Sequence, residues 1–206
     1  MKNSVSKLIA FVLFAFVTSS NMFAQTFTEG AFDNLSATRL LVNTEATTIK
    51  THFTKLGFAD GGLATENTKR FTGTDKVGAF TIEIASLKMR KGTSIVQLTT
   101  ISLKRGTGTD VIVMAEDGSN RYFVENGQVK TRARTSSSSS SVSDCVSQYF
   151  LGTASSCSSC VTCVTGCVSS NSDWAAKAIC SVKCVGSCVS CVSNLIGFIK
   201  CVIKAL

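Results

Sequence analysis

The spacing of apolar residues between residues 25 and 134 predicts a helix at the start of this segment. Over residues 34–56 the apolar side chains could form a stripe along one helical face. These residues are Leu35, Leu40, Leu41, Ile49 and Phe53. Gly57 follows, and glycine often ends a helix because it readily adopts the left-handed conformation.

Strands are predicted after this helix, because the period of the apolar residues changes to two. The alternating segments are residues 79–84, 94–98, 110–114, 121–124 and 128–130. Asp117-Gly118 and Asn126-Gly127 are typical of tight hairpin turns. The sequence therefore predicts an α+β domain over residues 25–134, a helix followed by an antiparallel β-meander. We expect this domain to fold on its own.

All ten cysteines follow this domain, and their positions are nearly palindromic. The spacings are 3, 3 and 4 residues from Cys157 to Cys167, and 4, 4 and 3 from Cys180 to Cys191. Such steps keep side chains on one face of a helix. Ten cysteines allow many connectivities, but the symmetry favours a disulfide-stapled, all-α helical hairpin that turns near residues 169–173. The nested bridges expected are Cys145–Cys201, Cys157–Cys191, Cys160–Cys188, Cys163–Cys184 and Cys167–Cys180.

Residues 1–24 have the layout of a secretory signal peptide. Lys2 and Lys7 precede an apolar run over residues 8–17, and small or polar residues lead to a cleavage position after Ala24. A retained membrane anchor is the alternative, but the apolar run is too short for a spanning helix. We therefore expect a secreted, extracellular protein that crosses the periplasm and whose cysteines meet an oxidising environment.

Six consecutive serines at residues 136–141 predict a linker over residues 135–144. This linker would separate the α+β domain from a cysteine-rich module over residues 145–206. Lys130, Arg132 and Arg134 precede the serines and are candidate positions for proteolytic processing.

Composition excludes several classes of function. The formal net charge is +8, but the basic residues are scattered, without the basic stripe and stacking aromatics typical of nucleic-acid binding. Nucleophile elbows, phosphate loops and metal-ligand signatures are absent from residues 25–134. We expect neither an enzyme nor a bound cofactor. The single His52 is interpreted as a solvated helix residue.

The first cysteine group also matches the ligand spacing of bacterial iron–sulfur ferredoxins. Val168 stands where a proline is expected after Cys167, and the second group does not repeat the motif in the same direction. Ten clustered thiols could alternatively bind zinc or a softer metal, so an exported metal-binding protein stays open as an alternative. The helical spacing favours disulfides and no metal.

The C-terminal tail, residues 194–206, is apolar with two lysines. One interpretation is that it covers the core of the hairpin. The other is that it contacts a membrane, with lysines near the headgroups. The candidate contact residues are Leu195, Phe198, Ile199, Lys200, Val202, Ile203 and Lys204.

In layout and cysteine count the chain resembles the precursors of halocin-type cysteine-rich bacteriocins. The segment from Cys163 to Cys184 is also similar to the plant α-hairpinins, whose two CxxxC helices are joined by nested bridges. The first resemblance implies that the C-terminal module is released as an antimicrobial peptide and that the N-terminal domain is associated with immunity. Expected partners are a bacterial membrane surface or a receptor on target cells, and the N-terminal domain is a candidate partner of the module. The alternative is an uncleaved extracellular structural or interaction protein.

Overall fold

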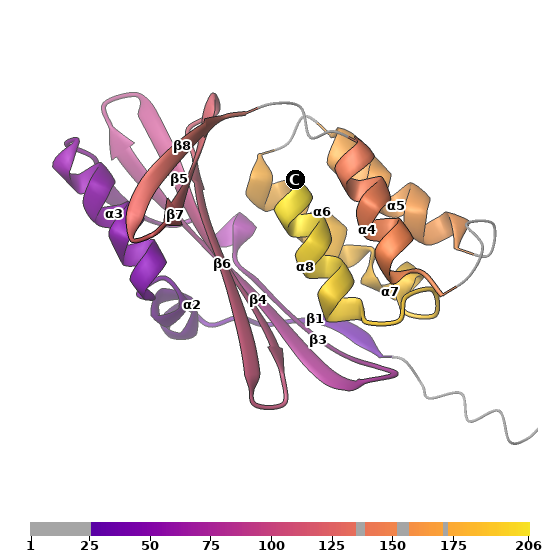
Figure 1. Cartoon of the computed structure of the whole chain (residues 1–206). Coiled ribbons are helices and arrows are strands. Elements are labelled where there is room, and N and C mark those ends of the chain that lie inside the picture. The colour runs from indigo at the N-terminus through magenta and orange to yellow at the C-terminus, as the bar shows by residue number, and fades with distance from the viewer. Residues whose placement is uncertain (1–25, 135–138, 152–156, 171–172) are drawn as a thin grey trace, which may run out of the picture.

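The protein consists of one antiparallel sheet with helices on both faces (Figure 1). The computed structural model describes residues 26–134, 139–151, 157–170 and 173–206. The expected signal peptide with Ala24, and the first residues of the serine segment, lie outside the described residues.

The sheet has eight strands in the order β1-β3-β4-β5-β6-β7-β8, and β2 also pairs with β4. The strands are β1 (Phe27–Gly30), β2 (Ala59–Leu63), β3 (Lys69–Asp75), β4 (Gly78–Lys91), β5 (Ser94–Arg105), β6 (Gly108–Glu116), β7 (Asn120–Glu125) and β8 (Gln128–Ala133). A short 3-10 helix, η1 (Thr65–Asn67), lies between β2 and β3. The predicted meander corresponds to β4–β8 and is confirmed.

Tight turns join the strands of the meander. Asn126 and Gly127 have φ values of 52° and 75°, and Glu125 and Gln128 pair on either side of them. Both turn residues therefore adopt the left-handed conformation that asparagine and glycine tolerate best. The two-residue Asn126-Gly127 turn thus sets the register in which β7 pairs with β8.

Two helices, α2 (Asn34–Leu40) and α3 (Thr44–Lys55), lie on one face of the sheet. The prediction of one continuous helix over residues 34–56 is therefore wrong, because the chain forms two helices there. The Asn43 side chain accepts a hydrogen bond from the Ala46 backbone N–H and begins α3 as its N-cap. Ile49 and Phe53 are buried, whereas Leu35 is exposed and does not belong to the core.

The described residues of the cysteine-rich region form five helices on the opposite face. They are α4 (Ser139–Tyr149), α5 (Ser158–Ser169), α6 (Trp174–Lys183), α7 (Val185–Cys188) and α8 (Leu195–Ala205). The antiparallel pair formed by α5 and α6–α7 is the expected helical hairpin. The linker was predicted to reach residue 144, but the chain is already helical from Ser139.

The two faces of the sheet belong to two different hydrophobic cores. Because side chains alternate along a strand, one face of β4 packs with α2 and α3, through Ala85, Leu87 and Met89. The other face supplies Phe80, Ile82 and Ile84 to a core shared with the cysteine-rich region. The α+β domain and the cysteine module are therefore joined by continuous apolar packing.

Candidate functional site

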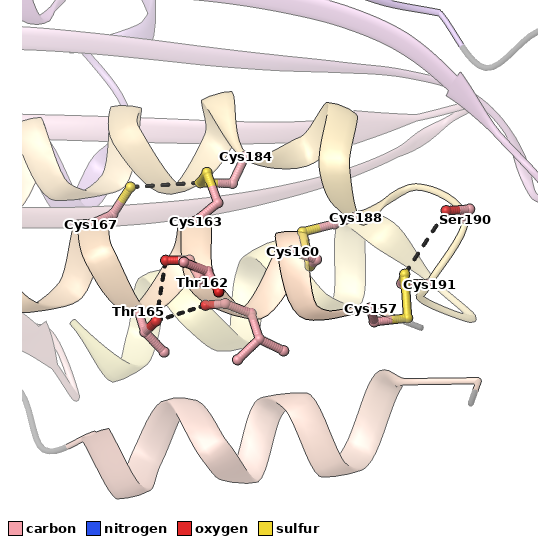
Figure 2. The surroundings of a disulfide bond; sticks show 11 residues. Cys157, Cys160, Thr162, Cys163, Thr165, Cys167, Cys184, Cys188, Ser190 and Cys191 are labelled. Atoms are coloured by element: carbon pink, nitrogen blue, oxygen red, sulfur yellow. Dashed lines mark hydrogen bonds between the residues drawn. A yellow bond between two sulfur atoms is a disulfide. The ribbon is translucent and has the colours of Figure 1, made fainter. Parts of the chain in front are cut away.

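A ladder of five disulfides crosses the cysteine module. Figure 2 shows three of them, Cys157–Cys191, Cys160–Cys188 and Cys163–Cys184. The pairing is the nested one that the palindrome predicts, and no cysteine is free. The Cα–Cα distances lie between 4.7 and 5.7 Å, within the usual range for a bridge. Four rungs join α5 and its N-cap Cys157 to the segment that runs from α6 past α7, and the outermost rung joins α4 to α8. Multiple disulfides indicate an oxidising environment for the folded chain.

The apolar residues of the C-terminal tail lie inside the protein. Leu195, Phe198, Ile199, Val202 and Ile203 are each at most 3% exposed and belong to the core shared with the sheet. In the intact chain these five apolar side chains are covered, so membrane contact through them stays a prediction for a separated module. The interpretation in which the tail covers the core is confirmed.

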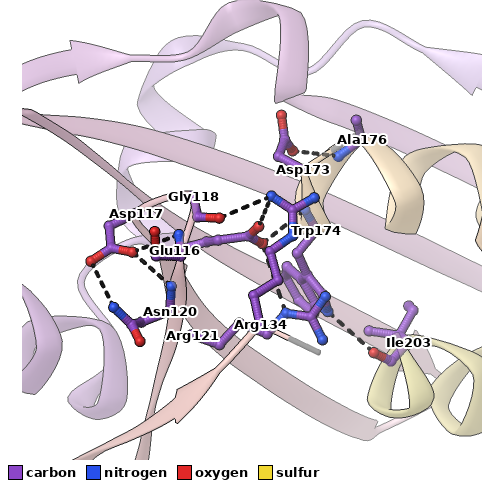
Figure 3. Close-up of polar contacts among 11 residues, drawn as sticks. Glu116, Asp117, Gly118, Asn120, Arg121, Arg134, Asp173, Trp174, Ala176 and Ile203 are labelled. Carbon is purple, nitrogen blue, oxygen red and sulfur yellow. Dashed lines mark hydrogen bonds and ion pairs between the residues drawn. The ribbon is translucent and has the colours of Figure 1, made fainter. Parts of the chain in front are cut away.

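A buried carboxylate, Glu116, connects the sheet to the module (Figure 3). It lies at the end of β6, and its Oε2 accepts a hydrogen bond of 3.0 Å from the backbone N–H of Trp174, the first residue of α6. Its Oε1 lies 2.8 Å from the Arg134 guanidinium, and Arg121 lies 3.9 Å from Oε2. A negative charge at the start of a helix is stabilised by the helix dipole and by the free N–H groups there.

Trp174 anchors this junction in the apolar core. Its indole is 2% exposed, and its Nε1–H donates to the backbone carbonyl of Ile203 in α8 at 3.3 Å. Asp173 caps α6 by accepting from the Ala176 N–H at 2.8 Å. One residue therefore links the sheet, the start of α6 and the end of α8.

Lys177 lies one turn further along α6 and is 6% exposed. Burial lowers the pKa of its ammonium group, and the nearby positive charges of Arg121 and Arg134 lower that pKa further. Glu116 acts in the opposite direction and favours the charged form. The junction thus collects three basic side chains around one carboxylate.

Two further ion pairs join the module to the sheet. Lys183 of α6 lies 3.3 Å from Glu29 of β1, and Lys200 of α8 lies 2.5 Å from Asp110 of β6. A hydrogen bond from Lys69, together with the nearby Lys183, holds the pKa of Glu29 below its ordinary value. In both the Lys183–Glu29 and the Lys200–Asp110 pair, the sheet supplies the acid and the module supplies the lysine.

The turn after β6 fixes the position of Glu116. Asp117 accepts hydrogen bonds from the backbone N–H groups of Ser119 and Asn120 and from the Tyr122 hydroxyl at 2.5 Å. Burial and this hydrogen bond raise the pKa of Tyr122 to about 12. The Tyr122 ring packs edge-on against Phe53 of α3, so the turn is tied to the opposite helical layer.

The candidate processing residues lie at the edge of the sheet. Lys130 and Arg132 belong to β8 and pair with Phe123 and Arg121 of β7. Their side chains are exposed, but cleavage beside either residue requires β8 to leave the sheet. Arg134 follows β8 and is held by Glu116.

Two places in the described part of the chain bear on whether a metal or cofactor could bind. The sulfur atoms of Cys163, Cys167 and Cys184 lie within 4.8 Å of one another, but each belongs to a disulfide and offers no thiolate. A cavity of about 210 Å³ opens beside the junction and is lined partly by Glu116, Asp173 and Arg134. The Glu116 and Asp173 carboxylates are already engaged there by Arg134 and by helix α6, as described above. This arrangement is that of a structural junction.

Among the described helices, none is long and apolar enough to cross a membrane. Comparison of the chain with protein-family models, with curated proteins and with solved structures finds no match. Function is therefore inferred from the site itself.

The junction residues were not found from the sequence. Glu116 and Trp174 are 58 residues apart, and no local pattern indicates that they meet. The available signals were weak: an acidic residue that ends the apolar strand β6, and a lysine placed among the apolar residues of α6. The disulfide pairs were found because their spacing is itself the signal.

Proposed function

We propose that the chain is a secreted precursor of an antimicrobial peptide, in which the α+β domain covers the active face of the cysteine module. The observation that carries the proposal is the composition of the shared interface. Of the four lysines in residues 145–206, Lys177 is buried at the junction and Lys183 and Lys200 pair with acids of the sheet. Apolar residues of the module belong to the same covered region.

A surface that is both apolar and cationic is the kind that binds anionic bacterial membranes. A receptor on the target cell with an acidic, apolar site would recognise the same chemistry. In the precursor, the sheet supplies acids and apolar side chains to this face. Separation of the module would expose it.

The disulfide ladder supports activity of the released module. A helix such as α5, composed of Ser, Thr, Val, Cys and Gly, has weak intrinsic helix propensity. Each bridge removes conformational freedom from the unfolded chain and contributes about 2–4 kcal/mol. The module would therefore keep its helices after the sheet is removed. Export by the segment at residues 1–24 belongs to the same proposal.

The direct test separates the two parts of the oxidised protein. A specific protease site replaces residues in the 136–141 serine segment, and the cleaved chain is resolved in denaturant without reducing agent. We expect the refolded module, with five bridges verified by mass, to inhibit growth of related bacteria, whereas the intact chain does not. Adding back the α+β domain should suppress the inhibition.

A matched control replaces Lys183 and Lys200 with glutamine in the module. These substitutions leave the disulfides in place, so loss of inhibition would assign the activity to the two lysines that pair with acids of the sheet. The proposal is wrong if the correctly oxidised module neither inhibits nor permeabilises any related strain.

An uncleaved extracellular interaction protein is a second candidate, and one observation favours it. The apolar core runs without a break from the sheet into the module, as expected for a chain that functions as one piece. The intact mass of secreted material distinguishes the two, because processing yields a fragment of the C-terminal module. The exported metal-binding alternative requires free thiolates, and all ten cysteines are bridged.

A further inference from the structure

Two neighbouring rungs of the ladder are in direct contact through their sulfur atoms. Cys167 Sγ lies 3.6 Å from Cys184 Sγ (Figure 2), although Cys167 is bonded to Cys180 and Cys184 to Cys163. Both sulfur atoms belong to buried residues, with Cys167 3% and Cys184 1% exposed. The packing of α5 against α6 therefore holds a sulfur of one disulfide against a sulfur of the next.

In each of these two disulfides, the cysteine outside the sulfur–sulfur contact is more exposed than its bonded partner. Cys180 is exposed, and Cys163 is half-buried. A thiolate from solution can therefore reach Cys180, while the contacting sulfurs of Cys167 and Cys184 are shielded. Attack at an accessible sulfur is a requirement of thiol–disulfide exchange.

We infer that these four cysteines form an exchange relay in which Cys180 is attacked and Cys163 emerges as the reactive thiol. In the first step, an external thiolate bonds to Cys180 Sγ, and the Cys167–Cys180 bond breaks. The electron pair of that bond leaves on Cys167 as a buried thiolate. The product is a mixed disulfide between Cys180 and the external thiol.

In the second step, the Cys167 thiolate attacks the sulfur that it already touches. A Cys167–Cys184 bond forms, the Cys163–Cys184 bond breaks, and the negative charge moves to Cys163. A half-buried sulfur is better solvated than a buried one, so this transfer is favoured. At every step at least one of these bridges joins α5 to the segment formed by α6 and its C-cap Cys184.

A small dithiol completes the reaction. Its second thiolate attacks its own sulfur in the mixed disulfide with Cys180, which releases Cys180 as a thiol and leaves the dithiol as a cyclic disulfide. The protein gains two electrons and two protons, and the dithiol loses the same number. The reduced product contains Cys163 and Cys180 thiols and a Cys167–Cys184 bridge.

Partial reduction of the full-length oxidised protein tests this relay. A limiting amount of dithiothreitol is added, the reaction is stopped with acid, and free thiols are alkylated before peptide mapping. We expect labels on Cys180 and Cys163, together with a peptide pair joined through Cys167 and Cys184. Labels on Cys180 and Cys167 with the Cys163–Cys184 bridge intact would overturn the inference.

A variant gives an independent test without any reductant. Cys180→Ser leaves Cys167 as a single free thiol beside Cys184. Attack by Cys167 on Cys184 would release Cys163, so alkylation should occur mainly at Cys163. Cys201→Ser is the matched control, since it frees Cys145 from the outermost bridge and should be labelled at Cys145 alone. Alkylation of the Cys180→Ser protein only at Cys167 would contradict the relay.

Discussion

The sheet and the cysteine module each contribute buried apolar residues, but the two regions are stabilised by different means. In the sheet, β4 and β5 pair continuously from Thr81 and Lys104 to Lys91 and Ser94, and apolar side chains alternate between two cores. The module contains short helices of weak helix formers, held by five disulfides. Cooperative pairing stabilises one region and covalent links stabilise the other.

This difference shows how a sequence with weak helix propensity can still form helices with a fixed arrangement of side chains. The bridges reduce the entropy of the unfolded module, so its exposed residues are free to be small and polar. The sheet relies instead on its strand pairing and on apolar side chains that pack on both of its faces.

Full reduction should have the largest effect and should act unequally on the two regions. Because each bridge contributes about 2–4 kcal/mol, we expect the module to lose its helices. The strands β4 and β5 should keep most of their hydrogen-bonded pairing. Circular dichroism with and without reductant, combined with hydrogen exchange of β5 peptides, measures this. Equal loss of protection in β5 and α5 would show that the regions do not differ in this way.

Truncation of the shared anchor should cost nearly as much. Trp174→Ala removes a buried indole and its hydrogen bond to Ile203, so the free energy of unfolding should fall by about 3–5 kcal/mol. Denaturant unfolding of the oxidised protein checks the value. Leu35→Ala, at an exposed position, is the control and should change it little; a small effect of Trp174→Ala would argue against a shared core.

A substitution in the sheet alone gives a smaller, local effect. A Cβ at Gly73 would lie 2.5 Å from the Phe80 ring and 2.6 Å from the Thr26 carbonyl. Gly73→Ala should therefore destabilise the protein by about 1–3 kcal/mol. Gly30→Ala is the matched control, because nothing lies within 4 Å of its added Cβ. Thermal unfolding compares the two variants, and equal melting temperatures would contradict the packing described.

The smallest effect concerns pH. Burial lowers the pKa of Lys177 in the folded state below its usual 10.5, so the unfolded chain binds more protons between the two values. Stability should therefore rise with pH through that window. Lys177→Met should remove part of this rise, as measured by urea unfolding between neutral and alkaline pH. An unchanged slope would mean that Lys177 is not buried at the junction.

The sequence predicted what is encoded locally or by symmetry. The hairpin turn at Asn126 and the disulfide pairs follow from spacing alone. The strands β1, β2 and β3 were missed because FTEG, ADGGL and KRFTGTD show little apolar alternation. The break before α3 depends on the cap formed by Asn43, a local signal that the apolar stripe concealed.

The junction could not be predicted because its contacts form only when the chain has folded. Glu116 meets Trp174, and Asp110 meets Lys200, across 58 and 90 residues. A charged residue at a strand end is normally a solvated one. Only the docking of α6 and α8 on the sheet turns these acids into partners of the module.

Hydrogen exchange of the module, alone and within the intact oxidised chain, tests most directly whether the sheet covers the cationic, apolar face. We expect amides of α6 and α8 to exchange faster in the isolated module, because both helices contact the sheet through Lys183 and Lys200. Amides of α5, which packs on α6 and α7 and is held by the bridges, should change little. Unchanged exchange in α6 and α8 would contradict the account.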